Sequence, residues 1–300
     1  MIEEKTAQKL SGFWIKVLAF LFMTLDHIGL FLLANPANQT VYNIGYVFRV
    51  IGRISLPLIL LLAAEGARHT RNIWKYFVRL MIMHVGISAF MTVFVYAAPQ
   101  FGLTIINAPA NAFADLSILV LTIACLKQKR FLKLLALLPF SFVVMVYVLQ
   151  MIEKSQSITI YWLPTYLRPD YSLFGLFIGL GFYYSRPIAA FLSKPILANA
   201  GISMDVYQES KQFQRMVNIV SMCLLFFVTV IFWGISYIGW NFDYRPYDTY
   251  SMQGQSYCLL ALIPMFFYSG TRGYDSKAMR IATYFYYPVH IAILFLIFSL

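Results

Sequence analysis

The sequence predicts an all-α, polytopic integral membrane protein: a helical bundle of about nine transmembrane helices forming one domain over residues 1–300. Of the 300 residues, 60% are hydrophobic and only 12% are charged, about half the charged fraction of a soluble domain. The mean hydropathy of +0.70 is too high for a single span in an otherwise soluble chain. About nine stretches approach the roughly 20 apolar residues that a bilayer helix needs.

Each expected span is an apolar run between polar connections. In chain order the spans are residues 13–33, 44–64, 74–97, 112–127, 131–150, 170–185, 216–238, 255–270 and 281–299. The first run is not followed by a small-residue cleavage site, so we expect a retained helix rather than a signal peptide. Segment 187–203 is apolar but contains two prolines, and we expect it to lie along the inner interface or to re-enter the membrane.

Basic residues alternate between the connections. They crowd the N-terminal tail and the turns near residues 68–79, 127–133, 186–215 and 272–280, whereas the intervening loops carry few or none. The positive-inside rule therefore predicts a multi-pass protein of the cell (inner, cytoplasmic) membrane with its N-terminus in the cytoplasm and its C-terminus outside. The aromatic loop 239–254 would then face outward, in the headgroup belt or as a lid over a site. These turns account for the net charge of +11, so we expect no nucleic-acid partner.

Ionisable residues inside the spans are the strongest indication of function. An arginine at the centre of a bilayer helix costs about 2.5–3.5 kcal/mol on insertion scales, yet Arg49 and Arg53 both lie in the second span, one turn apart. Asp26 and His27 lie in the first span, and neighbouring helical residues point about 100° apart. We therefore expect Asp26 to pair with Arg49 or Arg53, and His27 to address a different partner such as substrate.

The last span carries a second intramembrane histidine, His290, close to Tyr284, Tyr287 and the kinking Pro288. A histidine in a membrane helix can also be a simple packing group, and both interpretations stay open for His290.

Other polar residues have plainer interpretations. Asp115 and Asp170 open two spans and are expected to be helix caps near the outer interface. We expect His84 to be a packing residue and His69 to be solvated. Arg68 and Arg71 belong to a basic turn that sets topology, although such a turn can also hold the phosphates of a cytosolic donor.

Some chemistries lack their usual motifs. The sequence has no Walker A loop, no HExxH and no GxSxG elbow. The three cysteines share no CxxC spacing and are interpreted as packing residues, so no metal site is expected.

An ordered set of motifs resembles the TraX family, membrane proteins named for the conjugation factor that N-acetylates F pilin and similar to the wider group of membrane acyltransferases. The resemblance extends over nearly the whole chain. The motifs that carry it are Met23–Gly29 (MTLDHIG), Gly52–Pro57 (GRISLP), Glu65–Asn72 (EGARHTRN), Lys75–Leu80 (KYFVRL), Tyr268–Gly273 (YSGTRG) and Tyr287–His290 (YPVH).

The resemblance implies an integral-membrane acyltransferase that uses acetyl-CoA as the acyl donor. The acceptor would be an amine or hydroxyl of a peptide, lipid or envelope glycan, with membrane lipids as further partners. We expect His27 to be the general base, because neutral imidazole predominates near pH 7, with Asp26 and Arg53 completing the catalytic group. Substrate-binding candidates are Arg49, Tyr287, His290, Arg68 and Arg71.

Two other functions are compatible with the residues. A transporter or flippase would use buried Asp, His and Arg as a proton relay or as substrate ligands. A non-catalytic membrane partner of an envelope assembly would need them only for packing. Cleavage of labelled acetyl-CoA distinguishes the enzyme from both.

Overall fold

A computed structural model describes residues 9–34, 36–97, 111–241 and 254–299, and this part of the chain is helical without a named strand. The predicted all-α, polytopic class is confirmed. The longer helices are α1 (Gly12–Ala34), α2 (Gln39–Gly52), α3 (Ser55–His69), α4 (Ile73–Ala97), α5 (Ala112–Leu126), α6 (Leu137–Gln156), α7 (Ser172–Ala200), α9 (Lys211–Asn241) and α12 (Lys277–Ser299). Short helical pieces are η2 (Arg130–Ala136), η3 (Thr165–Leu167), α8 (Met204–Gln208), η4 (Tyr257–Ala261) and α11 (Leu262–Phe266).

The predicted count of nine spans is not confirmed. Within the described residues, seven helical segments are long and apolar enough to cross a membrane. The two remaining predicted spans, 112–127 and 255–270, correspond to the shorter apolar helices Ala112–Leu126 and Gly254–Phe266. Most residues of α5 are buried, so this helix is surrounded by protein and does not need the full length of a lipid-facing span.

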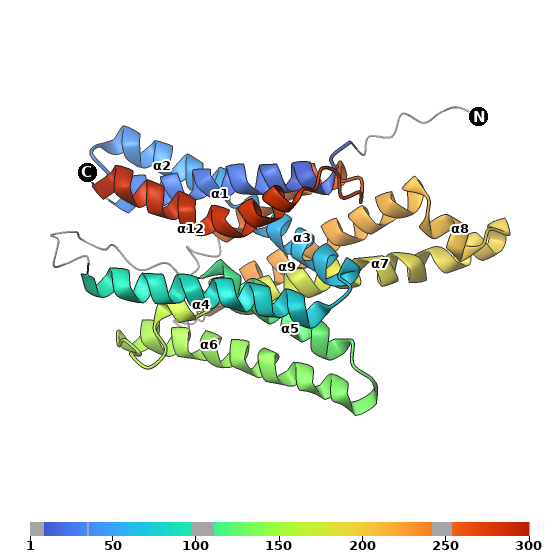
Figure 1. Cartoon of the computed structure of the whole chain (residues 1–300), viewed down its shortest axis with the longest axis horizontal. Coiled ribbons are helices and arrows are strands. Elements are labelled where there is room, and N and C mark those ends of the chain that lie inside the picture. The colour runs from blue at the N-terminus through green and yellow to red at the C-terminus, as the bar shows by residue number, and fades with distance from the viewer. Residues whose placement is uncertain (1–8, 35, 98–110, 242–253, 300) are drawn as a thin grey trace.

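The helices form two groups joined by α3. In Figure 1, α1, α2 and α12 lie side by side at the top of the view, while α4, α5 and α6 lie below. One buried apolar core extends from Ile15 of α1 to Tyr287 of α12. The helices α1 and α12 start at one end of the bundle, and α12 finishes at the other (Figure 1).

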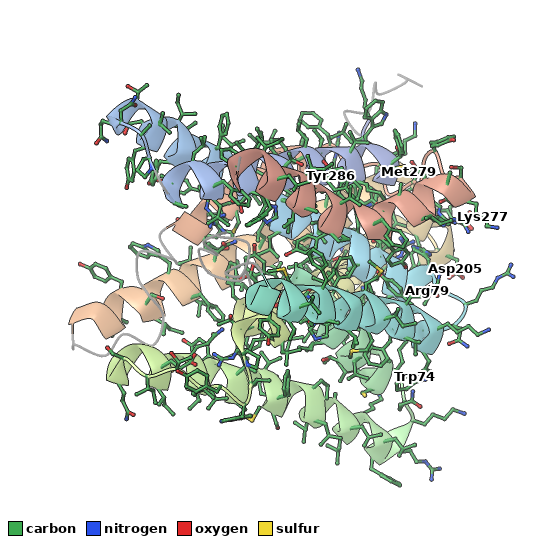
Figure 2. All side chains as sticks on the ribbon, turned by 60° about the vertical axis from the view of Figure 1, so that its left-hand side comes forward. Trp74, Arg79, Asp205, Lys277, Met279 and Tyr286 are labelled. Atoms are coloured by element: carbon green, nitrogen blue, oxygen red, sulfur yellow. The ribbon has the colours of Figure 1, made fainter. Side chains whose placement is uncertain are left out.

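One end of the bundle, here called the basic end, is where α3 and α5 finish and α4 and α12 begin. Figure 2 shows Arg79 and Lys277 at this end. The turns predicted to be cytoplasmic thus lie together, as the alternation of charge requires. The aromatic loop expected to face outward falls almost entirely at residues 242–253, outside the described residues.

The helix predicted over residues 170–185 does not end before segment 187–203, because α7 continues through both Pro187 and Pro195 to Ala200. Pro187 lacks the N–H that would bond the carbonyl of Tyr183. Arg68 replaces that donor, since its Nη2 lies 2.7 Å from the Tyr183 oxygen. The helix also packs along α9 through a small apolar cluster around Ala189 and Phe213. Side-chain hydrogen bonding and packing therefore keep the helix intact.

The helix predicted over residues 44–64 is broken in the middle, at Arg53 and Ile54. Pro57 explains the position of this break, because a proline ring clashes with the carbonyl four residues earlier, here that of Arg53. The preceding Gly52 lies against Asp26 so closely that any side chain would collide with it. The break and this close approach set Arg53 beside the middle of α1.

Candidate functional site

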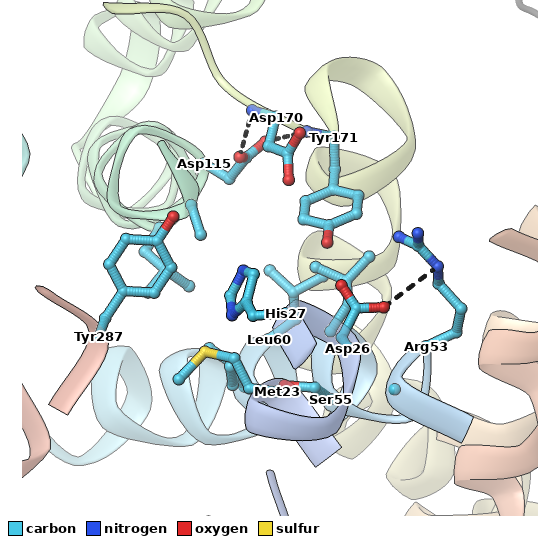
Figure 3. Close-up of a pocket in the computed structure, with 15 residues that line it drawn as sticks. Met23, Asp26, His27, Arg53, Ser55, Leu60, Asp115, Asp170, Tyr171 and Tyr287 are labelled. Atoms are coloured by element: carbon cyan, nitrogen blue, oxygen red, sulfur yellow. Dashed lines mark hydrogen bonds and ion pairs between the residues drawn. The ribbon is translucent and has the colours of Figure 1, made fainter. Parts of the chain in front are cut away.

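A polar cavity lies beside the break between α2 and α3 (Figure 3). Its volume is about 50 Å³, enough for a few water-sized groups. Its walls come from α1, the α2–α3 break, and the starts of α5 and α7, together with one residue of α12. The lining residues are Met23, Asp26, His27, Gly52, Arg53, Ser55, Leu56, Ile59, Leu60, Ala112, Asp115, Leu116, Asp170, Tyr171 and Tyr287. We call this cavity the polar pocket.

Asp26 is paired with both arginines of the second predicted span. It forms an ion pair with Arg49, and its Oδ1 lies 3.6 Å from Nε of Arg53. The expected pairing of Asp26 is therefore present, and it involves both candidates. Asp26 is buried, and Oδ1 accepts no hydrogen bond from the described residues. This oxygen and the Arg53 guanidinium are held at the pocket wall with bonding capacity left over.

Arg53 has a further partner that the sequence did not indicate. Its Nη1 donates to Oε1 of Gln255 at 3.1 Å, a residue that precedes the short helices η4 and α11. Gln255 is buried, and its Nε2 has no partner among the described residues. The glutamine thus binds a different nitrogen of the guanidinium from the one nearest Asp26. Gln255 is 202 positions away from Arg53 in the sequence. The residues around Gln255 therefore gave no indication that it contacts Arg53.

The two intramembrane histidines are bonded to each other. His27 Nδ1 lies 2.8 Å from His290 Nε2, and His290 Nδ1 lies 2.7 Å from the carbonyl oxygen of Tyr286. A carbonyl only accepts, so Nδ1 of His290 carries its proton. In a neutral His290 the Nε2 then accepts from Nδ1–H of His27, which leaves Nε2 of His27 with a free lone pair. The chain of hydrogen bonds thus selects the tautomer in which His27 is a base.

Tyr286 supports this arrangement and was not selected from the sequence, which pointed to Tyr284 and Tyr287. Its hydroxyl lies 2.7 Å from Oγ1 of Thr24, and its ring stacks on Phe20 with centroids 4.3 Å apart. Tyr286 and His290 are four residues apart, as are Phe20 and Thr24 on α1, so each pair lies on one face of its helix. This helical spacing is the sequence signal that could have identified Tyr286.

The two aspartates expected to be caps behave differently. Asp115 is not a helix N-cap: its Oδ2 and Oδ1 accept the backbone N–H groups of Asp170 and Tyr171 at 2.7 and 3.1 Å, in the turn just before α7. Asn111 caps α5. The cap prediction for Asp170 is also wrong, because the N-cap of α7 is Tyr171 and the Asp170 side chain lines the polar pocket instead.

Of the five predicted substrate-binding residues, Arg68 and Arg71 lie away from this pocket. Arg68 is thirteen residues beyond Ser55, or about 20 Å along α3, and it pairs with Glu65 at the basic end. Arg71 is exposed there. Of the substrate-binding candidates, Tyr287 lines the pocket, whereas Arg49 and His290 lie directly behind Asp26 and His27. In the described part of the chain no three His, Cys, Asp or Glu residues are grouped to hold a metal ion.

Together the fold and the pocket define a multi-pass helical membrane protein with a charged cavity between its helices. The family model described as TraX protein matches residues 11–88, which confirms the predicted resemblance over that part of the chain. This stretch holds α1, α2, α3 and much of α4, including Asp26, His27 and both arginines. The motifs near Tyr268 and His290 lie outside it.

One curated protein is similar to this chain, again over only part of the sequence. The chain is 37% identical over 75 residues to a probable fimbrial assembly protein FimC, serogroup H1, of Dichelobacter nodosus. The match covers 25% of this chain and 29% of that protein's length. No solved structure matches the chain.

Proposed function

We propose that this protein is an integral-membrane acyltransferase that moves an acetyl group from acetyl-CoA to an amine or hydroxyl acceptor, with His27 as the general base. The single observation that carries the proposal is the hydrogen-bonded chain from Tyr286 through His290 to His27. It holds an unprotonated imidazole nitrogen on a side chain that lines the polar pocket, as the Arg53 guanidinium also does. The similarity to the TraX family, associated with pilin acetylation, supports the same chemistry.

The proposed reaction uses each group once. Nε2 of His27 removes the proton from the acceptor as its nitrogen or oxygen attacks the thioester carbonyl carbon. The carbonyl oxygen becomes an oxyanion, which Arg53 stabilises. The C–S bond then breaks, the acetyl group stays on the acceptor as an amide or ester, and the CoA thiolate takes the proton from His27. His290 is a positioning residue, since it contacts the base and not the reacting atoms.

The charges around Arg53 fit this role. Asp26 is shared between two arginines, so these three side chains together carry a net positive charge, and the Asp170 carboxyl group lies in the same pocket and interacts with both guanidinium groups. A fixed positive charge in a poorly hydrated cavity stabilises a developing oxyanion more than it would in water. Arg71, exposed at the basic end, is the proposed contact for donor phosphates. This assignment places the basic end in the cytoplasm, the N-terminus with it, and the C-terminus outside the cytoplasmic membrane.

Labelled acetyl-CoA tests the proposal with the purified full-length protein in lipid vesicles. The unmodified protein should release free CoA thiol and label an acceptor, and His27→Ala should lower this rate by about 10²–10⁴-fold, the usual contribution of a general base. His84→Ala is the matched control, because it also removes a membrane-helix histidine but one that lies outside the polar pocket.

His290→Ala tests the positioning role separately. Loss of the partner nitrogen frees His27 to adopt the other tautomer, so the rate constant should fall while the KM for acetyl-CoA changes little. His290→Gln should restore part of the rate, because its amide oxygen can accept from His27. Full activity in a folded His27→Ala protein would remove His27 as the base. Movement of a substrate without thioester cleavage would favour a transporter.

A further inference from the structure

Three carboxyl groups line the polar pocket, and two of them are already bound. Asp26 is paired with two arginines, and Asp115 accepts two backbone N–H groups. The Asp170 carboxyl has no ion-pair partner among the described residues, and Asp170 is exposed whereas the other two are buried. We propose that Asp170 is a further catalytic residue, which holds the acceptor beside His27 and makes the site discriminate between an amine and a hydroxyl; this rests on the proposed acyltransferase function.

The Asp170 side chain is directed into the cavity. Its carboxyl points into the space between His27, Tyr171 and Tyr287 (Figure 3), and all four residues line the polar pocket. The carboxyl interacts with the Tyr171 side chain and, at longer range, with both guanidinium groups. An ionised carboxyl has about four lone-pair sites. Asp170 therefore keeps bonding capacity for an acceptor, and its exposure means that a ligand can reach it.

The turn that carries Asp170 is fixed on both sides. Just before it, Arg168 is 1% exposed, and its Nη2 donates to Oε1 of Glu153 at 2.9 Å. Asp115 accepts the N–H of Asp170 itself at 2.7 Å. Just after it, Ser172 has a φ of +46°, a left-handed conformation that is strained for any residue but glycine. Strained backbone clusters at functional sites, and here it belongs to the turn that directs a carboxyl into the pocket.

The number of hydrogens on the acceptor decides what the site holds well. Nε2 of His27 and the Asp170 carboxylate both accept hydrogen bonds and donate none. A neutral amine has two hydrogens, one for each group, and its lone pair is then free to attack the thioester carbonyl. A hydroxyl has one hydrogen, so bonding it to His27 turns an oxygen lone pair towards the Asp170 carboxylate. A site built around a substrate N–H rejects an analogue that lacks it, because its own polar group is left unpaired.

The protons balance for an amine acceptor. Amines are mostly protonated near pH 7, and the ammonium form is attracted to the Asp170 carboxylate. One proton passes to water at this exposed end of the pocket before the nitrogen attacks. His27 takes the second proton as the C–N bond forms, and the CoA thiolate receives that proton as the C–S bond breaks. The products are the amide, free CoA thiol and one proton in water.

The position of Asp170 also indicates where the acceptor enters. Arg68, at the basic end, bonds the carbonyl of Tyr183 on α7. The helix begins at Ser172, eleven residues earlier, or about 17 Å along its axis. The exposed Asp170 carboxyl therefore lies on the side of the pocket away from the basic end. The acceptor and the donor phosphates approach the pocket from different sides.

Propylamine and propanol, which differ only in the nucleophile, test the proposal on the full-length protein in lipid vesicles. With labelled acetyl-CoA, the unmodified protein should acetylate propylamine in preference to propanol. Asp170→Asn should raise the KM for propylamine about 10–100-fold, the contribution of a hydrogen bond to a charged group, with the KM for acetyl-CoA unchanged. The preference should move towards propanol, because the new amide can donate to a hydroxyl oxygen.

Matched variants separate this effect from a loss of folding. Asp205→Asn removes an exposed carboxylate on α8, outside the pocket, and should leave both KM values unchanged. Asp170→Glu keeps the charge and should keep the preference for propylamine. Asp170→Ser, which also removes the charge, replaces Asp170→Asn if that protein does not fold.

A binding measurement requires no turnover. Propylamine without acetyl-CoA should raise the unfolding temperature of the unmodified protein and of Asp205→Asn, but not that of Asp170→Asn. An equal rise in all three proteins, or no rise in any, would overturn the proposal. An Asp170→Asn protein that keeps both its KM and its preference for propylamine would overturn it too.

The inference and the proposed function fail in different ways. If propylamine binds through Asp170 but the unmodified protein releases no CoA, the amine site stands and the acyltransferase is removed. If acetyl transfer proceeds and Asp170→Asn alters neither KM nor preference, the acyltransferase stands and Asp170 is only a solvated carboxylate.

Discussion

The same residue types lie near both ends of α3, with different consequences. At its start, Asp26 pairs with Arg49 and Arg53 beside the polar pocket. At its end, Glu65 pairs with Arg68 and His69 at the basic end. The hydrogen bonds of Arg68 have a structural role, because its Nη2 donates to the backbone carbonyls of Phe182 and Tyr183 at 3.0 and 2.7 Å.

A second cation completes the structural cluster at the basic end. Nζ of Lys127 donates to the carbonyl of Ala67 at 2.7 Å, which satisfies one of the last carbonyls of α3. The Lys127 and Arg68 cations both lie over the ring of Tyr183. Buried arginine in a membrane chain therefore does not by itself mark a site. The distinguishing feature is whether its partners are carbonyls at helix ends or side chains that line a cavity.

The largest expected effect is on stability at the pocket end. Asp26→Leu leaves two buried guanidinium groups without their shared carboxylate, and breaking a buried pair in this way typically costs about 3–5 kcal/mol. We expect a marked loss of folded protein and of thermal stability in detergent. Asp26→Leu combined with Arg49→Met removes one of the two charges and should recover part of that loss. Equal stability of the two variants would show that the three charges do not act together.

Arg53→Gln should have the next largest effect, and mainly on catalysis. Asp26 keeps its pair with Arg49, so the fold should survive, while loss of one oxyanion donor lowers the turnover number by about 10²–10³-fold. The measurement is thioester cleavage with labelled acetyl-CoA. Unchanged turnover would mean that Arg53, like Arg68, is a structural cation.

Arg68→Gln is the matched change at the other end and should have the opposite profile. It removes the donor that satisfies the carbonyl freed by Pro187, and an unsatisfied buried acceptor costs about 1–3 kcal/mol. We expect a lower unfolding temperature with an unchanged turnover number. A fall in turnover at constant stability would instead assign Arg68 to the donor site.

The smallest effect is expected at Asp275, in the turn before α12. Hydrogen bonds from Arg280 lower the pKa of Asp275 below its ordinary value, with Arg272 adding to the effect. A depressed folded-state pKa stabilises the fold above the unfolded pKa, and this contribution is lost as the pH falls through the folded value. Asp275→Asn should therefore lower the unfolding temperature slightly at neutral pH and not at all in strong acid. The difference between unfolding curves at the two pH values checks this.

Much of the fold was predictable because hydropathy and charge are local properties. Apolar runs located every long helix, and the basic turns correctly predicted which connections share an end. The predicted helix ends were wrong where they rested on a proline without knowledge of its neighbours in space. Pro187 and Pro195 lie inside α7 because Arg68 and the packing of α9 compensate, whereas Pro57 lies just after a true break. Nothing local to a proline says whether such compensation exists.

The sequence by itself determined the helical membrane class and the presence of Asp26, His27 and the two arginines inside apolar segments, because each follows from the order of neighbouring residues. Only the tertiary structure decided that His27 bonds His290, 263 positions away, and that Gln255 reaches Arg53. Such contacts depend on which helices lie side by side. Helix adjacency follows from packing over the whole chain, for which a single span carries no signal.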